Sequence, residues 1–199
     1  MLLPTGKLRK NYLVRDTVNY IWGDRGSAMF SEIKPFINTT DRIVDIGAGM
    51  CHIDKSLIDR GYQVTPVDIQ DLSIFENIMP VIYNGKTLPF KDNEFNVALL
   101  LDMLHHVTNP VSLLKEVKRV AKKLIVMEGT YQNQKQKYLT IIMDSVTNLE
   151  FFGHPHNNKD DSQWREIFEN LGLEVKIYQR HDFWQFFEAT TYVLERKAS

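Results

Sequence analysis

The sequence predicts an α/β fold, in which a mostly parallel β-sheet is flanked by helices. Residues 42–46 form a short β-branched run that ends at two glycines and is followed by a helical pattern. Residues 95–101 are nearly all apolar, which is typical of a strand buried on both faces of a parallel sheet. Two further strand patterns, 173–178 and 183–195, are separated by only a few residues, so we expect them to pair as an antiparallel hairpin.

Length and composition set the class of protein. The chain has 199 residues, of which 43% are hydrophobic, enough for one domain with one buried core. The net charge is −1 and charges of both signs are scattered, which disfavours nucleic acid as a partner. The single cysteine excludes an internal disulfide, and no apolar run reaches the length of a signal peptide core or a membrane span. We therefore expect a cytoplasmic protein without membrane insertion, and the oligomeric state stays open.

Two helices are predicted before the first strand. Apolar residues recur at helical spacing up to Gly23, and they do so again after Gly26. The first group is Val14, Val18, Ile21 and Trp22, and the second is Met29, Ile33, Phe36 and Ile37.

The glycine pair after the first strand is the main functional signal. Gly47 and Gly49 lack the Cβ that would keep a ligand away from the backbone, and the helix that follows offers unpaired N–H groups at its start. That helix pattern stops at Gly61. Asp68 ends the next strand about twenty residues later, where a carboxylate can accept hydrogen bonds from both hydroxyls of a ribose. The arrangement predicts a site for a cofactor that contains a nucleoside.

Two classes of cofactor fit such a turn. A dinucleotide fingerprint counted from Gly47 requires a glycine at position 52, which here is His52, so a nicotinamide-dependent oxidoreductase is disfavoured. The pattern Asp45-Ile-Gly-Ala-Gly49 instead resembles the first motif of the class I S-adenosylmethionine-dependent methyltransferases. A third glycine that is common in that family falls at Cys51.

A second segment carries the resemblance further. Residues 88–95, LPFKDNEF, resemble the LPF segment of the type 11 methyltransferases, the family similar to enzymes of ubiquinone and menaquinone biosynthesis. In that family an acidic residue a few positions earlier contacts the adenine amino group. That position is Asn84, followed by Gly85, and the amide oxygen of Asn84 can accept the same hydrogen bond. The pair His105-His106 after the fourth strand also resembles this family.

The resemblance covers roughly residues 40 to 196 and implies the architecture. It implies a Rossmann-like seven-stranded sheet in the order 3-2-1-4-5-7-6, with strand 7 antiparallel and helices on both faces. The extra helix pattern at 134–152 is not needed for a crossover, so we interpret it as an inserted lid. We expect one methyltransferase domain over 1–199, divided into N-terminal helices (1–40), a cofactor-binding core (41–130), the lid insertion (131–160) and a final helix with the β-hairpin (161–199).

The predicted cofactor-binding residues lie at strand ends, where ligands of open α/β sheets bind. They are Asp45, Gly47, Ala48, Gly49, Asp68, Ile69, Asn84, Gly85 and Asp102. The helix before the sixth strand must begin at the same edge of the sheet, and the loop that leads into it carries His154 and His156. Because a histidine titrates near neutral pH, we predict His154 or His156 as general base or substrate anchor, and His105 as a positioning residue.

The predicted function is methyl transfer from S-adenosylmethionine to an oxygen, nitrogen or carbon atom of a small molecule, with S-adenosylhomocysteine as product. Three alternatives stay open. One is a non-catalytic module that binds S-adenosylmethionine, and another is the disfavoured nicotinamide-dependent oxidoreductase. In the third, Glu150, His154 and His156 bind a metal ion that assists the reaction, although methyl transfer itself requires no metal.

Overall fold

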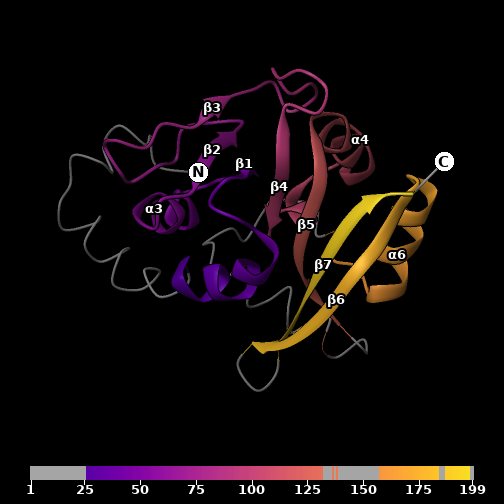
Figure 1. The fold of residues 1–199 in the computed structure, drawn as a ribbon. Coiled ribbons are helices and arrows are strands. Elements are labelled where there is room, and N and C mark those ends of the chain that lie inside the picture. Colours follow the sequence, from indigo (N-terminus) through magenta and orange to yellow (C-terminus); the bar gives the residue numbers. More distant parts are fainter. Residues whose placement is uncertain (1–25, 132–135, 137, 139–156, 184–186, 198–199) are drawn as a thin grey trace. The chain divides into compact units, whose positions relative to one another are not determined.

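The computed structural model describes residues 26–131, 136, 138, 157–183 and 187–197. Its strands are β1 (Arg42–Ile46), β2 (Gln63–Asp68), β3 (Val81–Ile82), β4 (Phe95–Leu101), β5 (Ala121–Thr130), β6 (Leu173–Phe183) and β7 (Phe187–Arg196). They form one sheet in the order β3-β2-β1-β4-β5-β7-β6, shown in Figure 1, which confirms the predicted order. Contacts group the chain into two compact units, residues 1–99 with 119–122 and residues 100–118 with 123–199. We call them the first unit and the second unit.

In the first unit, β1 pairs in parallel with β2 on one side and with β4 on the other. Helix α3 (His52–Asp59) follows the glycine turn after β1 and contacts β2. Gly61 lies just past the helix with a φ of 82°, and the N–H of Tyr62 donates to the carbonyl of Leu57 at 3.1 Å. This is the expected geometry of a glycine that ends a helix, so the predicted stop is confirmed.

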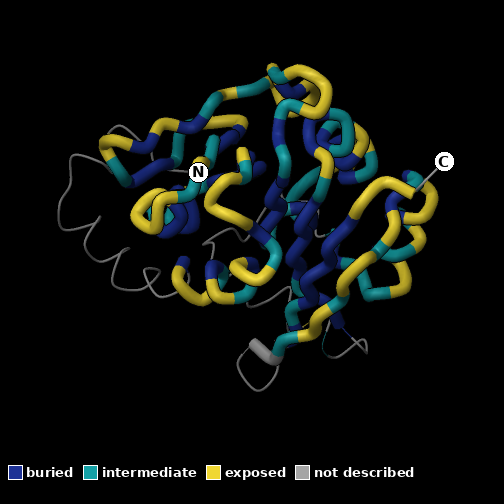
Figure 2. The backbone as a smooth tube through the Cα atoms, in the orientation of Figure 1, coloured by how far each residue is buried: buried dark blue, intermediate teal, exposed yellow. Residues whose placement is uncertain are grey.

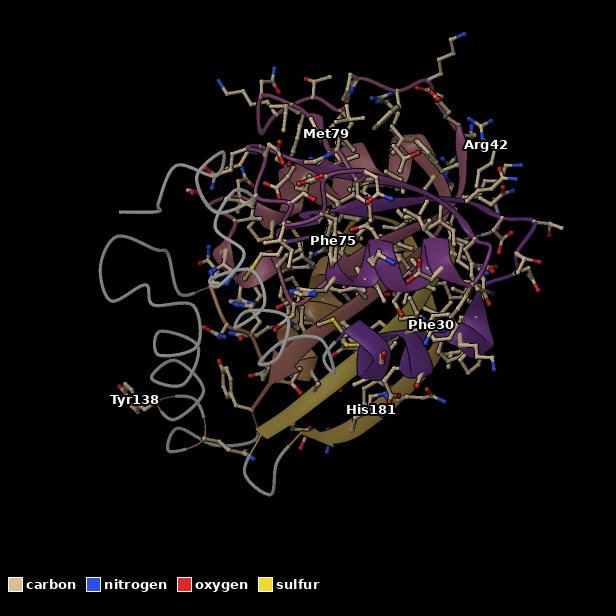
Figure 3. All side chains as sticks on the ribbon, turned by 90° about the vertical axis from the view of Figure 1, so that its left-hand side faces the viewer. Phe30, Arg42, Phe75, Met79, Tyr138 and His181 are labelled. Carbon is tan, nitrogen blue, oxygen red and sulfur yellow. The ribbon has the colours of Figure 1, made fainter. Side chains whose placement is uncertain are left out.

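The second of the two predicted N-terminal helices is confirmed over residues 26–33, and the short 3-10 helix η1 (Lys34–Phe36) follows it. Phe30, labelled in Figure 3, lies edge to face with Tyr62 at a ring distance of 5.8 Å. The guanidinium of Arg60 stacks over the Phe30 ring at 4.6 Å, which anchors this helix beside α3. The first predicted helix lies outside the described residues.

In the second unit, α4 (Pro110–Val120) begins at Asn109, whose side-chain oxygen accepts the N–H of Ser112 at 3.0 Å. This cap agrees with the sequence prediction. The apolar pattern of the sequence predicts a fifth strand over residues 124–127, closed by Glu128 and Gly129, and this prediction is too short. Both residues continue the strand to Thr130, since their backbones pair with Thr190 and Ala189 of β7.

The antiparallel hairpin of β6 and β7 is confirmed, but its turn was predicted too early. Residues 180–182, which were expected to turn the chain, belong to β6 and pair with residues 188–190 of β7. The Arg180 guanidinium lies 2.6 Å from the carboxylate of Glu188, which is buried. Cross-strand pairing of charged residues therefore extends the strand through a segment whose polarity resembles that of a turn.

Helix α6 (Asp161–Asn170) starts three residues before the predicted Trp164. Asp160 caps it, because the Asp160 side chain accepts the N–H of Gln163 while the Gln163 side chain accepts the N–H of Asp160. Of the predicted lid helix, the described residues include only Gln136 and Tyr138. Both are helical, and Tyr138 is 64% exposed (Figure 3).

The buried residues follow the central strands, as Figure 2 shows in dark blue. Residues 97–100 of β4 are fully buried, as expected for a strand covered on both faces. In the second unit, Trp164, Phe168 and Tyr192 form a buried aromatic group, with Phe168 and Tyr192 edge to face at 5.2 Å. Within the described ranges, no helix combines the length and the apolar character needed to cross a membrane.

Candidate functional site

The glycine turn after β1 leaves its surface open. Gly47 and Gly49 have φ angles of 75° and 53°, which side chains rarely adopt. The N–H groups of Gly47 and Ala48 both donate to the carbonyl of Val67, at 2.8 and 3.1 Å, and so tie the turn to β2. A Cβ added to Gly49 would meet only the Gly47 carbonyl oxygen, at 3.9 Å. A ligand can therefore approach the backbone at Gly49 closely.

Asp68 at the end of β2 holds this turn from the side. One carboxylate oxygen accepts the N–H of Gly49 at 2.9 Å, and the other accepts the N–H groups of Ile69 at 2.7 Å and Gln70 at 3.3 Å. A carboxylate has about four acceptor positions, so about one position remains, on the oxygen that faces Gly49. Sequence reasoning predicted Asp68 as a ligand for ribose, but it did not predict that Asp68 clamps the glycine turn.

Cys51 occupies the position of the third glycine of the family motif. It has a φ of 62°, a left-handed conformation that is rare for residues other than glycine, asparagine and aspartate. Its side chain is fully buried in a small apolar cluster with Ala48 and Ile78. Burial raises the pKa of the Cys51 thiol, so this side chain serves packing at the base of the turn.

A pair of buried carboxyl groups, Asp45 and Asp54, lies close enough to Cys51 to affect its thiol. Asp45 in β1 is 2% exposed and Asp54 in α3 is completely buried. Burial, followed by the neighbouring Asp54 carboxyl, raises the pKa of Asp45 well above its ordinary value. Burial also raises the pKa of Asp54 to about 7, although its hydrogen bond with Asp45 acts in the opposite direction. Burial and the neighbouring carboxyl groups therefore favour the protonated form of Asp45.

Sequence reasoning singled out Asp45 and missed Asp54. An acidic residue in the first turn of a helix is usually explained by the helix dipole, which favours negative charge there. The signal that could have identified it is its place one helical turn after the glycine motif, close to the buried end of β1.

The predicted adenine side of the site is formed by segments after β2 and β3. Ile69 is 59% exposed, and a Cβ added to Gly85 would lie 3.6 Å from its Cγ2, so these two residues are neighbours. The side-chain oxygen of Asn84 accepts the N–H groups of Lys86 and Thr87, both at 2.9 Å. Asn84 thus fixes its own loop as an Asx turn, and its contact with adenine stays a prediction.

A second group of polar residues lies in the second unit, where β4 ends. Asp102 has a φ of 56°, although it is not a glycine, and its N–H donates to the carbonyl of Met127 at 2.7 Å. The chain then enters the short 3-10 helix η2 (Leu104–His106), which carries the predicted His105.

Glu128 of β5 binds this turn through both carboxylate oxygens. Oε1 accepts the N–H groups of Met103 and Leu104, at 3.0 and 2.6 Å, and Oε2 lies 2.7 Å from Nδ1 of His105. Glu128 is 1% exposed and His105 is 3% exposed. Sequence reasoning expected Glu128 to close a strand and considered it as the base if no histidine has that role, but it did not predict this contact.

Asp102, His105 and Glu128 together have a spacing that could suit a metal ion, since one ligand atom from each lies within 4.8 Å of the others. The carboxylate of Glu128 already accepts two backbone N–H groups and faces the imidazole, so its oxygens are committed to hydrogen bonds. The three residues of the metal alternative, Glu150, His154 and His156, lie outside the described residues.

The predicted catalytic histidines of the loop cannot be placed, but the residue that follows them can. The N–H of Asn157 donates to the carbonyl of His105 at 3.1 Å, and its side-chain amide donates to the carbonyl of Val107 at 2.7 Å. The end of the loop is thus bound to η2 beside His105.

The chain is similar in sequence to known proteins. The sequence model of a family described as a methyltransferase domain matches residues 44–124. The ubiquinone biosynthesis O-methyltransferase of Stutzerimonas stutzeri is 24% identical over 123 residues, which are 51% of this chain and 53% of that protein. The chain spans about half the length of the curated relatives it matches.

Solved structures extend the likeness to the fold. An S-adenosylmethionine-dependent methyltransferase of Methanosarcina mazei has a TM-score of 0.67 at 18% identity, covering 84% of this chain and 98% of the other. The magnesium protoporphyrin IX methyltransferase of Synechocystis, solved with bound S-adenosylhomocysteine, has a TM-score of 0.64 at 15% identity, covering 94% and 88%. The resemblance found in the sequence is confirmed: residues 44–124 match the model of a methyltransferase domain, and the chain shares its Rossmann-like fold with solved structures of S-adenosylmethionine-dependent methyltransferases.

Proposed function

We propose that this protein binds S-adenosylmethionine at the glycine turn and transfers its methyl group to a small-molecule acceptor. The observation that carries the proposal is the open turn of Gly47 and Gly49, held by the Asp68 carboxylate at the end of the neighbouring strand. The match to the model of a methyltransferase domain, over residues 44–124, includes all of these residues and supports the proposal.

Each predicted cofactor residue has a role in this proposal. The backbone from Gly47 to Gly49 approaches the cofactor, and the remaining acceptor position of Asp68 takes one ribose hydroxyl. The exposed side chain of Ile69 and the adjoining Gly85 provide an apolar surface for adenine. The other predicted cofactor residues are Asp45, Ala48, Asn84 and Asp102.

Methyl transfer from S-adenosylmethionine chiefly requires the protein to align the acceptor atom with the methyl group. S-adenosylmethionine supplies a methyl group on a sulfonium, whose sulfur leaves as a neutral thioether when the acceptor atom forms its new bond to carbon. Holding acceptor and methyl group in line contributes part of the roughly 7–11 kcal/mol that proximity can supply. An oxygen or nitrogen acceptor also releases a proton, for which we propose His154 or His156 as base, with His105 as a positioning residue.

The name of one relative supports an acceptor class. The Stutzerimonas protein is an O-methyltransferase, so an oxygen acceptor is the first candidate, while nitrogen and carbon acceptors remain within the proposal. We also propose that the chain is one methyltransferase domain, with residues 131–160 as its lid.

A transfer experiment tests the function. The purified protein is incubated with S-adenosylmethionine that carries a deuterated methyl group and with fractions of a small-molecule extract. We expect mass spectrometry to show a metabolite that gains the labelled methyl mass, together with S-adenosylhomocysteine. The Gly49→Val variant serves as the control and should show neither product.

Two outcomes would replace the proposal. Binding of S-adenosylhomocysteine without transfer to any fraction would favour the non-catalytic binding module. Binding of NADH more tightly than S-adenosylhomocysteine would favour an oxidoreductase.

A further inference from the structure

We propose that Glu128 is a positioning residue of the methyl-transfer reaction, which fixes the His105 ring with its hydrogen on Nδ1 and with Nε2 as a hydrogen-bond acceptor. The kinetic part of this inference rests on the proposed function. The structural part rests on the hydrogen bonds of Glu128 and can be tested without an acceptor molecule.

The first step concerns the two oxygens of Glu128. Oε1 already accepts two N–H groups, from Met103 and Leu104, so the carboxylate is oriented by the backbone before the imidazole is considered. Oε2 then faces Nδ1 of His105 at 2.7 Å, a distance that requires a hydrogen between them. Since a carboxylate only accepts hydrogen bonds, this hydrogen belongs to Nδ1.

The second step concerns the imidazole. A neutral histidine carries one ring hydrogen, so a hydrogen on Nδ1 makes Nε2 the basic nitrogen. At 3% exposure, His105 is enclosed by protein and its ring cannot turn over freely. The buried carboxylate therefore selects both the tautomer and the ring orientation of His105.

The third step concerns the backbone. The same carboxylate binds the two residues that follow Asp102, and the N–H of Asp102 itself is bound by Met127. These bonds keep Asp102 in its left-handed conformation, a strain that persists only where the surroundings impose it. Glu128 thus binds three consecutive residues, Met103 to His105, which directly follow the predicted cofactor residue Asp102 in the chain.

Nuclear magnetic resonance of protein labelled with ¹⁵N-histidine tests the tautomer directly. We expect the His105 signals to show a protonated Nδ1 and an unprotonated Nε2 near pH 8, with His105→Gln identifying the signals by their loss. In Glu128→Gln, the amide oxygen can still accept the backbone N–H groups, but the amide NH₂ that then faces Nδ1 can only donate. Nδ1 must accept this hydrogen bond, so we expect the ring hydrogen to move to Nε2. Glu188→Gln is the matched control, because Glu188 is also buried but pairs with Arg180, and it should leave the His105 tautomer unchanged.

Kinetics on the identified acceptor form the second arm. We expect Glu128→Gln to lower kcat by about a hundredfold or more while the KM for S-adenosylmethionine stays within a few-fold, because the wrong tautomer disturbs the positioning residue His105 but removes no cofactor contact. Glu188→Gln should retain wild-type kcat.

A wild-type His105 with its hydrogen on Nε2 would overturn the inference, as would a Glu128→Gln variant with unchanged tautomer and kcat. If Glu128→Gln does not fold, the wild-type spectrum alone decides. A protein that shows the expected tautomer but binds no S-adenosylhomocysteine would refute the proposed function and leave the role of Glu128 in holding His105 intact.

Discussion

The two units use the same device at different turns. In the first unit, Asp68 of β2 binds the N–H of Gly49 in the turn after β1. In the second unit, Glu128 of β5 binds the N–H groups of Met103 and Leu104 in the turn after β4. In both cases a buried carboxylate on one strand holds a turn that contains a left-handed residue. A carboxylate can accept several N–H groups at once, so each of these two side chains can bind N–H groups of a tight turn.

The difference lies in what each turn presents. The first turn has glycines at its left-handed positions, so it offers bare backbone to a ligand. The second turn has Asp102 at its left-handed position. The Glu128 carboxylate that binds this turn also holds the imidazole of His105. One turn is suited to binding by close approach, and the other is suited to presenting side chains in fixed orientations. A side chain added to the first turn should therefore impair ligand binding, whereas removal of the Asp102 side chain from the second turn should change the stability only slightly.

The largest effect should come from a side chain on the first turn. We expect Gly49→Val to reduce the affinity for S-adenosylhomocysteine by at least about a hundredfold, equivalent to about 2.7 kcal/mol, because the side chain fills the ligand's space and φ is 53°. Calorimetry measures the affinity, and circular dichroism checks the fold. Gly61→Ala is the control, since Gly61 also has a positive φ but ends α3, and it should bind normally. A Gly49→Val protein that unfolds would show that this glycine is mainly structural.

Removing the clamp of the first turn should have the next largest effect. Asp68→Ala loses a charge-assisted hydrogen bond to the ribose, worth about 1.5–3 kcal/mol, and it also releases the N–H of Gly49. We expect the affinity for S-adenosylhomocysteine to fall by about one to three orders of magnitude. Asp71→Ala, three residues away, should change it little. Unchanged binding in Asp68→Ala would exclude Asp68 as the ribose ligand.

The buried acid pair of the first unit, Asp45 and Asp54, predicts that the stability of the folded protein depends on pH. The pKa of Asp54 is raised to about 7 in the folded protein, against about 3.9 for an unfolded chain. Its contribution to stability is therefore complete below about pH 4 and is lost as the pH rises through about 7.

We accordingly expect the variant Asp54→Asn, which cannot ionise, to melt near the wild-type temperature at pH 5. At pH 8 it should melt above wild type by several degrees, about 2–4 °C for each kcal/mol. Thermal unfolding at pH 5, 6, 7 and 8 measures this. Asp59→Asn on the exposed side of α3 is the control and should follow the wild-type curve. Parallel curves for Asp54→Asn and wild type would contradict the assignment.

The smallest effect should come from the left-handed residue of the second turn. Asp102→Gly relieves the cost of the positive φ but gives the unfolded chain more freedom, so we expect a change in unfolding free energy within about 1 kcal/mol. Asp102→Ala keeps the strain and should be less stable than Asp102→Gly by about 1 kcal/mol. Chemical denaturation of the two variants decides it, and an alanine variant at least as stable as the glycine variant would show that the turn is not strained.

Most of the strands and helices could be predicted because local patterns define them, and the sheet order followed from the resemblance to the class I methyltransferases. The apolar run of β4, the glycines after β1 and the cap at Asn109 are all signals carried by neighbouring residues. The strand ends were less predictable. Glu128 and Arg180 look like loop residues in sequence, and only their partners on β7 place them within strands.

The site shows the same limit. The glycine turn and Asp68 follow from a motif, whereas the buried pair of Asp45 and Asp54 and the clamp of Glu128 involve residues on different elements. A buried carboxylate and a solvated one have the same letter in a sequence, and burial is what changes their chemistry. The motif therefore predicted the cofactor residues, while the groups that hold them in place required the structure.

The most direct test of the central claim is a calorimetric titration of the wild-type protein with S-adenosylhomocysteine and, separately, with NADH. If the glycine turn and Asp68 form a site for the methyl donor, S-adenosylhomocysteine should bind at one site per chain with a dissociation constant of about 100 µM or tighter, about −5.5 kcal/mol. NADH should produce no binding heat at the same concentrations. Binding of NADH, or no binding of S-adenosylhomocysteine to the folded protein, would contradict the claim.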